Sequence, residues 1–227
     1  MVLSPFTGHK EFSKNWDAKE RTMPRTSLII LVVMFSISTL SAQDLQPTCK
    51  SCPGTYIPNE ELQAYAKRAI ATGAVDQQVR AVDIGRSNVD IGMVYRGKLA
   101  VPGANAVAEH DHVSEVYHII DGSATLMTGP DLVDKKRRPA DNEAVKLLNG
   151  PGNNASAIRN GVSHELKPGD VIIIPAGTGH LFTRIDDHIT YLMIRIDPDK
   201  VTPNKDEAAS KADLAGGART RGKAPNN

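Results

Sequence analysis

The residues best suited to chemistry lie close together in the middle of the sequence. His110 and His112 are two residues apart, and Glu115 follows at the start of an apolar run. On a β-strand, residues two apart project from the same face, so both imidazoles would point in one direction. Imidazole nitrogens and a carboxylate oxygen suit a divalent first-row transition metal, and this mix is close to a two-His-one-carboxylate set with a further His. Such a site requires His180, far along the chain, to join them.

Period-two patterns around these residues predict the strands that must position them. Strands are expected at residues 79–84, 89–95, 116–120, 124–127, 171–174, 181–184 and 189–196. The run Asp121-Gly122-Ser123 predicts a tight turn, and Pro175 with the glycines after it predicts a second turn just before His180. The predicted fold class is therefore all-β, and a metal site requires that the strands close into a barrel.

The composition indicates one globular domain with tails. The chain has 227 residues, 40% of them hydrophobic, and its formal net charge is +1. A charge this close to zero gives no electrostatic case for nucleic-acid binding. Aromatic residues make up only 4% of the chain. The core must therefore consist mainly of Val, Ile and Leu, which favour strands.

The amino-terminal part has the features of a targeting segment. Residues 27–40 form an apolar run that follows two arginines and precedes the small residues Ser41 and Ala42. This is the order of a secretory signal, and the run is short for a membrane span. We expect a signal segment over residues 1–43, cleaved near Ala42 or Gln43, with an uncleaved anchor as the alternative. The mature protein is then expected to be exported, periplasmic or secreted.

Residues 44–78 are predicted to form an extension with a C-x-x-C motif and a helix. Cys49 and Cys52 are the only cysteines in the chain. No His follows them to attach haem and no second pair completes a zinc site, so a local disulfide is favoured over a redox pair. After Asn59, the expected N-cap, apolar residues at helical spacing predict a helix that ends at Gly73. This helix would pack on the outside of the domain or on a neighbouring subunit, as in a homodimer.

Two further stretches depart from the strand pattern. Residues 129–161 form a long insertion, which inside a compact domain is usually functional or disordered. Its basic cluster, residues 135–138, is interpreted as a solvated face, with anion steering as the alternative. Residues 199–227 contain few large apolar side chains and are predicted to be a disordered tail.

Two spaced motifs carry a family resemblance. Residues 110–122 read His-x-His-x2-Glu-x6-Gly, and residues 169–180 read Gly-x5-Pro-x-Gly-x2-His. In this order they resemble the two motifs of the cupin superfamily, whose fold is a double-stranded β-helix or jelly-roll barrel. The resemblance covers roughly residues 79–198, and it implies the metal ligands His110, His112, Glu115 and His180. Because the gap before Glu115 is shorter than usual in the family, a three-His site with Glu115 outside the ligand set stays open.

Strand alternation also predicts which side chains line the barrel beside the ligands. Tyr117 shares the face of Glu115, while Phe182 and Arg184 share that of His180. Tyr117 is expected either to hydrogen-bond substrate or relay a proton, or simply to fill the barrel. An inward Arg184 requires an anionic partner, which is either a carboxylate substrate or a nearby acidic side chain. Glu115 would both bind the metal and shuttle a proton.

These residues together predict a metal-dependent function without fixing the reaction. The resemblance implies an oxidoreductase, dioxygenase-like, that acts on a small oxygen-rich or carboxylate-bearing molecule through bound Fe, Mn, Ni, Cu or Zn. One alternative is an exported cupin that binds a small acid or sugar without turnover, and another is a metal-dependent lyase or isomerase. The expected partner is a small molecule, with no nucleic acid and no membrane after signal removal.

Overall fold

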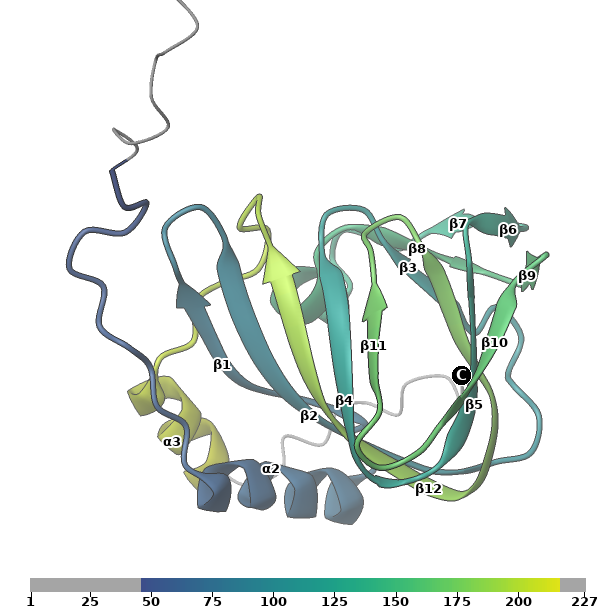
Figure 1. Cartoon of the computed structure of the whole chain (residues 1–227), viewed down its shortest axis with the longest axis horizontal. Coiled ribbons are helices and arrows are strands. Elements are labelled where there is room, and N and C mark those ends of the chain that lie inside the picture. The colour runs from purple at the N-terminus through teal and green to yellow at the C-terminus, as the bar shows by residue number, and fades with distance from the viewer. Residues whose placement is uncertain (1–45, 217–227) are drawn as a thin grey trace, which may run out of the picture. The chain divides into compact units, whose positions relative to one another are not determined.

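The computed structural model describes residues 46–216, which form antiparallel β-structure with helices outside it (Figure 1). The predicted signal segment, its cleavage near Ala42 or Gln43, and residues 217–227 lie outside the described residues. Within the described part of the chain, no helix is both long enough and apolar enough to cross a membrane.

Strands account for nearly half of the described residues. In chain order they are β1 (Asp76–Asp83), β2 (Asn88–Leu99), β3 (Val107–His110), β4 (Ser114–Gly122), β5 (Ala124–Gly129), β6 (Asp131–Val133), β7 (Lys136–Arg137), β8 (Gly152–Ala155), β9 (Ala157–Arg159), β10 (Val162–Leu166), β11 (Val171–Ile174) and β12 (Gly179–Asp197). The helices are α2 (Asn59–Thr72), a π-helical turn (Val145–Asn149) and α3 (Glu207–Ala215). The predicted all-β class is confirmed.

Strand β12 organises the barrel, because it belongs to both of its sheets. Its first part pairs with β5 and β3, and its second part pairs with β2 and β4, all antiparallel. The sequence pattern predicted two separate strands here, at residues 181–184 and 189–196. Irregularities in pairing at residues 182–184 and 185–188 explain the difference. An extra residue in one strand bends it, so one continuous strand can pass from one sheet to the other.

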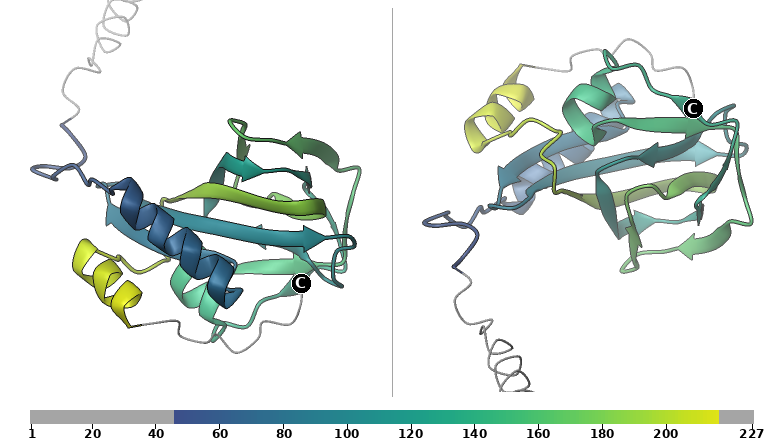
Figure 2. Two further views of the ribbon diagram at one scale, coloured as in Figure 1. Left: turned by 90° about the horizontal axis from the view of Figure 1, so that it is seen from below. Right: turned by 90° about the horizontal axis from the view of Figure 1, so that it is seen from above.

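The barrel interior is filled by side chains from both sheets. Its buried cluster comprises Val94, Tyr117, Ile119, Ala124, Leu126, Leu166, Ile174, Phe182, Ile185, Ile189, Tyr191 and Met193. They follow the period-two rule along β2, β4, β5 and the second part of β12, as expected for strands that face a core on one side. The two views of Figure 2 show the strands curving around this interior.

Helix α2 packs against the outside of the barrel, which is one of the two positions expected for it. Tyr65 and Ala66 are buried against Val79 of β1 and Met93 of β2. The helix ends at Gly73, which adopts the left-handed conformation with φ of +66°. That end matches the prediction from sequence, since glycine accepts this conformation without strain. Asn59 is the first helical residue and does not cap the helix, because Pro58 holds the N-cap position.

The long insertion is largely ordered and contributes to the sheet. Strand β8 within it pairs with β3, and Gly152 lies opposite His110 in this register. A Cβ atom added at Gly152 would lie only 2.2 Å from the carbonyl oxygen of Glu109. Glycine is therefore required for β8 to approach β3, the strand that ends at His110. The insertion thus supports the strand on which a predicted metal ligand lies.

The prediction of a disordered tail was wrong for residues 207–215, which form α3. Asp206 caps the helix by accepting a hydrogen bond from the backbone N–H of Ala209. Ser210 is fully buried and donates to the carbonyl oxygen of Val79 in β1. Lys205 binds both Asp213 and the carbonyl oxygen of Gln78. Polar contacts hold this helix in place, and a composition poor in large apolar residues cannot reveal them.

Candidate metal centre

Three of the four predicted ligands converge at one point in the barrel. His110 ends β3, Glu115 is near the start of β4, and His180 is near the start of β12. All three side chains are buried, with 3%, 1% and 8% of their residues' surface exposed, respectively. The strands meet because β12 pairs with both β3 and β4. The long-range pairing of β12 thus brings an imidazole from the second motif to those of the first.

The spacing of the three side chains suits a metal ion. The Nε2 atom of His110 lies 3.4 Å from Oε1 of Glu115, and the Nε2 atom of His180 lies 3.4 Å from Oε2. One ligand atom from each residue lies within 4.8 Å of the other two. Donor atoms bound at about 2.1 Å to a common first-row metal are separated by roughly 3.0–3.4 Å. The donor types and their spacing therefore fit a divalent transition metal.

The Nδ1 atoms of His110 and His180 have different hydrogen-bond partners. Nδ1 of His180 lies 3.3 Å from the carbonyl oxygen of Thr178, which can only accept, so Nδ1 carries the proton. Its Nε2 lone pair then faces Glu115, as metal binding requires. Nδ1 of His110 lies 3.2 Å from Nη1 of Arg138, which can only donate. His110 must therefore hold its proton on Nε2, and a metal there requires Arg138 to release Nδ1.

The buried charges have the ionisation that a metal site needs. Burial lowers the pKa of His110 to about 3 and also lowers the pKa of His180, so both imidazoles are neutral at pH 7. Burial alone would raise the pKa of Glu115, but the neighbouring His110, His180 and Arg195 lower it to about 2. A metal ion would therefore meet two neutral imidazoles and a carboxylate, and the one proton in its way is that on Nε2 of His110, which must move to Nδ1.

Tyr117 holds the carboxylate of Glu115 in place. Its hydroxyl donates a hydrogen bond of 2.6 Å to Oε2 of Glu115. Burial raises the pKa of Tyr117 well above its usual value, so the phenol remains a donor. Its ring packs 4.5 Å, centroid to centroid, from Tyr191 and is stacked with Phe182. The predicted inward position is confirmed, and the phenol makes its hydrogen bond to Glu115.

Arg195 also contacts Glu115, and the sequence analysis did not single it out. Its side chain is fully buried on β12, with Nε 3.4 Å from Oε1 of Glu115. A second guanidinium nitrogen binds the carboxylate of Asp76 on β1. The sequence held a signal, because Arg195 is the single charged residue in the otherwise apolar or neutral run at residues 189–196. A charge in such a run needs a buried partner.

His112 does not join the cluster. Its side chain is 42% exposed, and its Nδ1 lies 2.6 Å from Oδ2 of Asp199. The expectation that it shares a face with His110 assumed a strand through both residues. Strand β3 ends at His110, and the chain bends before β4 begins at Ser114. The alternation rule therefore does not apply to His112, and the predicted set of four ligands is reduced to three.

Arg184 also lies away from the barrel interior, contrary to expectation. Its side chain is 65% exposed and forms an ion pair of 2.7 Å with Asp186. The pairing of β12 with β5 shifts by one residue between Phe182 and Arg184. Such a bulge reverses the alternation, so Phe182 remains inside at 6% exposure while Arg184 points outward.

A different arginine occupies the interior beside Phe182. The guanidinium carbon of Arg96 lies 5.0 Å from the centre of the Phe182 ring. Nε of Arg96 donates to the hydroxyl of Tyr191 at 3.2 Å. The sequence analysis missed Arg96 because the predicted strand stopped at Tyr95, one residue short. Extending the strand would have placed Arg96 on the inward face of Val94, two residues earlier.

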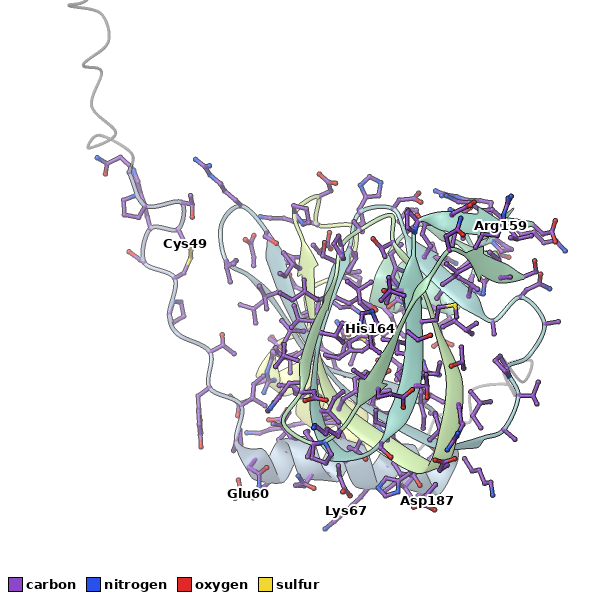
Figure 3. All side chains as sticks on the ribbon, turned by 45° about the vertical axis from the view of Figure 1, so that its right-hand side comes forward. Cys49, Glu60, Lys67, Arg159, His164 and Asp187 are labelled. Atoms are coloured by element: carbon purple, nitrogen blue, oxygen red, sulfur yellow. A yellow bond between two sulfur atoms is a disulfide. The ribbon has the colours of Figure 1, made fainter. Side chains whose placement is uncertain are left out.

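The two cysteines of the extension, Cys49 and Cys52, are joined by a disulfide, which is the pairing expected from the sequence. In Figure 3 Cys49 lies on the segment that precedes α2. Neither cysteine belongs to the cluster of buried ligands.

Comparison with known proteins agrees with the motifs and the barrel. The family model for the AraC-like ligand binding domain matches residues 152–215, which include the second motif. Together with the two motifs, this match supports the resemblance to the cupin superfamily. No curated protein matched this chain in a sequence comparison.

Solved structures with a similar fold are distant in sequence. A protein of Bacillus halodurans is 16% identical, with a TM-score of 0.38, over 72% of this chain and 98% of that chain. A cupin protein from Bacteroides fragilis is 13% identical, with a TM-score of 0.28, over 52% of this chain and 72% of that chain. The EutQ protein of Clostridium difficile is 13% identical, with a TM-score of 0.31, over 55% and 68%. No activity is inferred from these likenesses.

Proposed function

We propose that this protein is an exported, iron-dependent oxidoreductase of the dioxygenase type that acts on a small carboxylate-bearing molecule. The observation that carries the proposal is the ligand set itself. His110, His180 and Glu115 form two imidazoles and one carboxylate, whereas His112 lies outside. A two-His-one-carboxylate set with open positions is typical of non-haem iron(II) oxygenases.

The residues around such a centre would have different roles. Iron(II) bound here would supply the redox chemistry with dioxygen. Tyr117 and Arg195 each contact one oxygen of Glu115, so the carboxylate keeps its orientation toward the two imidazoles. Tyr117 and Tyr191 form a buried aromatic wall next to the ligands, and this wall excludes water from the barrel interior. A dry site strengthens the electrostatic interactions between the protein and a charged substrate.

One observation favours the alternative of ligand binding without turnover. Arg138 donates toward Nδ1 of His110 and so stabilises the tautomer whose Nε2 cannot bind a metal. If Arg138 keeps this contact in the cell, the barrel holds a small acid or sugar and no iron. A metal-dependent lyase or isomerase would use the same three ligands, and the ligand set does not favour it over an oxygenase.

Export is part of the proposal. The apolar segment at residues 27–40 has the order of a secretory signal. The disulfide between Cys49 and Cys52 supports an oxidising compartment, because disulfides persist there and are rare in the cytosol. A fusion of residues 1–43 to a reporter enzyme that is active only after export tests this part directly. A reporter that stays inactive would contradict it.

Elemental analysis of the protein purified from its own compartment tests the metal centre. The wild type is expected to carry iron, and His180→Ala is expected to lose it because one of three ligands is gone. His112→Ala is the matched control, since that imidazole lies on Asp199 and should leave the metal content unchanged. Equal metal content in wild type and His180→Ala would contradict the proposed centre. Loss of metal in His112→Ala alone would show that a different set of ligands binds it.

Oxygen uptake then separates turnover from binding. With iron bound, a panel of small carboxylates is added and dioxygen consumption is recorded with an electrode. Substrate-dependent uptake that disappears in His180→Ala supports the oxygenase. Ligand-induced thermal stabilisation without oxygen use would instead support the binding protein.

A further inference from the structure

Arg96 is a positive charge in the barrel that forms no ion pair with the described residues, although the charge of Asp76 acts on it. It lies on β2, is partly buried, and shares the inward face with Val94. Its contacts among residues 46–216 are the hydroxyl of Tyr191 and the ring of Phe182. No carboxylate of the described residues lies within ion-pair distance of it. A guanidinium that is taken partly out of water without a counter-charge is costly unless something else binds it.

The contacts that Arg96 does make hold it in a defined place. The hydrogen bond through Nε restricts the side chain, and the Phe182 ring packs under the guanidinium plane. These two contacts leave Nη1 and Nη2, the fork that binds carboxylates through two parallel hydrogen bonds, without a partner among the described residues. Because the fork is already oriented, a ligand would not have to order it.

Side-chain contacts connect Arg96 to one of the metal ligands. Tyr191, which binds Arg96, packs against Tyr117, and Tyr117 in turn binds Glu115. One row of aromatic residues therefore connects the guanidinium to the carboxylate ligand.

Arg138, a second guanidinium near the centre, is in a different situation. It contacts His110, Asn154 and the carbonyl oxygen of Asn153, and the negative charges of Glu115, Glu109 and Asp111 act on it. Glu115 is also in contact with Arg195. Of Arg96 and Arg138, Arg96 is therefore the guanidinium whose two Nη atoms have neither a hydrogen-bond partner nor an ion pair among the described residues.

We propose that Arg96 anchors the carboxylate of the substrate of the site formed by His110, Glu115 and His180. This assignment rests on the proposed function, because it names the substrate class of the same site. It replaces Arg184, which the sequence suggested for this role and which is paired with Asp186 on the surface. The ligand is a small carboxylate rather than a neutral sugar.

Binding of malonate to the metal-free protein tests the proposal. Metal is removed with a chelator, the chelator is dialysed away, and malonate is titrated by calorimetry with malonamide as the neutral isostere. The wild type is expected to bind malonate and to bind malonamide at least tenfold more weakly. Arg96→Gln is expected to lose at least tenfold in malonate affinity, and Arg96→Lys is expected to lose less because the charge remains.

The matched control is Arg184→Gln, which removes an exposed arginine from the same barrel and should bind malonate like the wild type. Equal malonate affinity in the wild type and Arg96→Gln would overturn the proposal, as would a wild type that binds malonate and malonamide equally or neither of them. Arg96-dependent binding of inorganic phosphate without binding of malonate would also overturn it. If Arg96→Gln fails to fold by circular dichroism, the neutral variant Arg96→Met takes its place, and a malonate affinity equal to that of the wild type would overturn the proposal.

Failure of this proposal can be told apart from failure of the metal centre. The titration is done without metal, so its result does not depend on whether iron binds. The iron content of Arg96→Gln, which retains all three ligands, is expected to equal that of the wild type. Loss of malonate affinity with unchanged iron content therefore assigns Arg96 to the substrate alone.

Discussion

Acidification of the metal-free protein is expected to destabilise it well above the pH at which carboxylates protonate. His110 has a pKa of about 3 in the folded protein and an ordinary value of 6.5. Because the folded pKa is depressed, the unfolded chain binds the proton first, and stability falls as the pH drops below 6.5. Well below pH 6.5 each pH unit costs about 1.4 kcal/mol for one such group. The total cost at pH 4.5 is about 2.7 kcal/mol, of which about 0.4 kcal/mol is already lost at pH 6.5.

Between pH 6.5 and 4.5 the stability is lost through the buried imidazoles and not through Glu115. The pKa of Glu115 is lowered from 4.5 to about 2, so its contribution is present above pH 4.5 and is lost only below that pH. The depressed pKa of His180 acts in the same direction as that of His110 and adds to the loss. A loss of 2.7 kcal/mol is large compared with the total stability of a typical domain, about 5–15 kcal/mol.

Urea unfolding at pH 6.5 and 4.5, followed by circular dichroism, measures the effect. Between these two pH values the free energy of unfolding of the wild type should fall by about 2.3 kcal/mol or more. In His110→Gln the unfolding reaction should take up about one proton fewer, so the free energy of unfolding should fall less steeply with pH. The control is His118→Gln, in which an exposed imidazole of β4 is replaced and which should match the wild type. If His110→Gln loses stability with pH as steeply as the wild type, then His110 is not buried as a neutral imidazole.

Three further changes test the surroundings of the site and the barrel. Arg138→Gln frees Nδ1 of His110 and should raise affinity for divalent metal about tenfold or more, as measured by competition with a chromophoric chelator; unchanged affinity would contradict the tautomer assignment. Tyr117→Phe removes a hydrogen bond to the carboxylate ligand and should weaken metal binding about 10- to 100-fold in the same assay, with the fold retained. Gly122→Ala should cost about 1–3 kcal/mol in urea unfolding, because φ is +75° and the new Cβ would lie 2.1 Å from a backbone carbonyl oxygen; Gly97→Ala, with open space around it, should cost less.

The sequence alone determined the features that depend on residues close together in the chain. Apolar patterns predicted β1, β2, β4, β5, β11 and the two parts of β12, but not β3, β8 or β10. Gly73 correctly predicted the end of α2. The motifs named His110, Glu115 and His180, and the spacing of residues within each motif does not change on folding. These predictions succeeded because the side-chain period of a strand and the conformational freedom of glycine are local properties.

The tertiary structure decided which of the named side chains meet. His112 left the ligand set because β3 stops at His110, and Arg184 pointed outward because of a bulge that only pairing with β5 produces. Arg96 and Arg138 took positions near the centre through strand pairing and through an insertion that looked like a loop. Helix α3 formed through polar contacts with distant residues. Long-range pairing sets where each strand ends and where it gains a residue, and a shift of one residue turns a side chain to the opposite face.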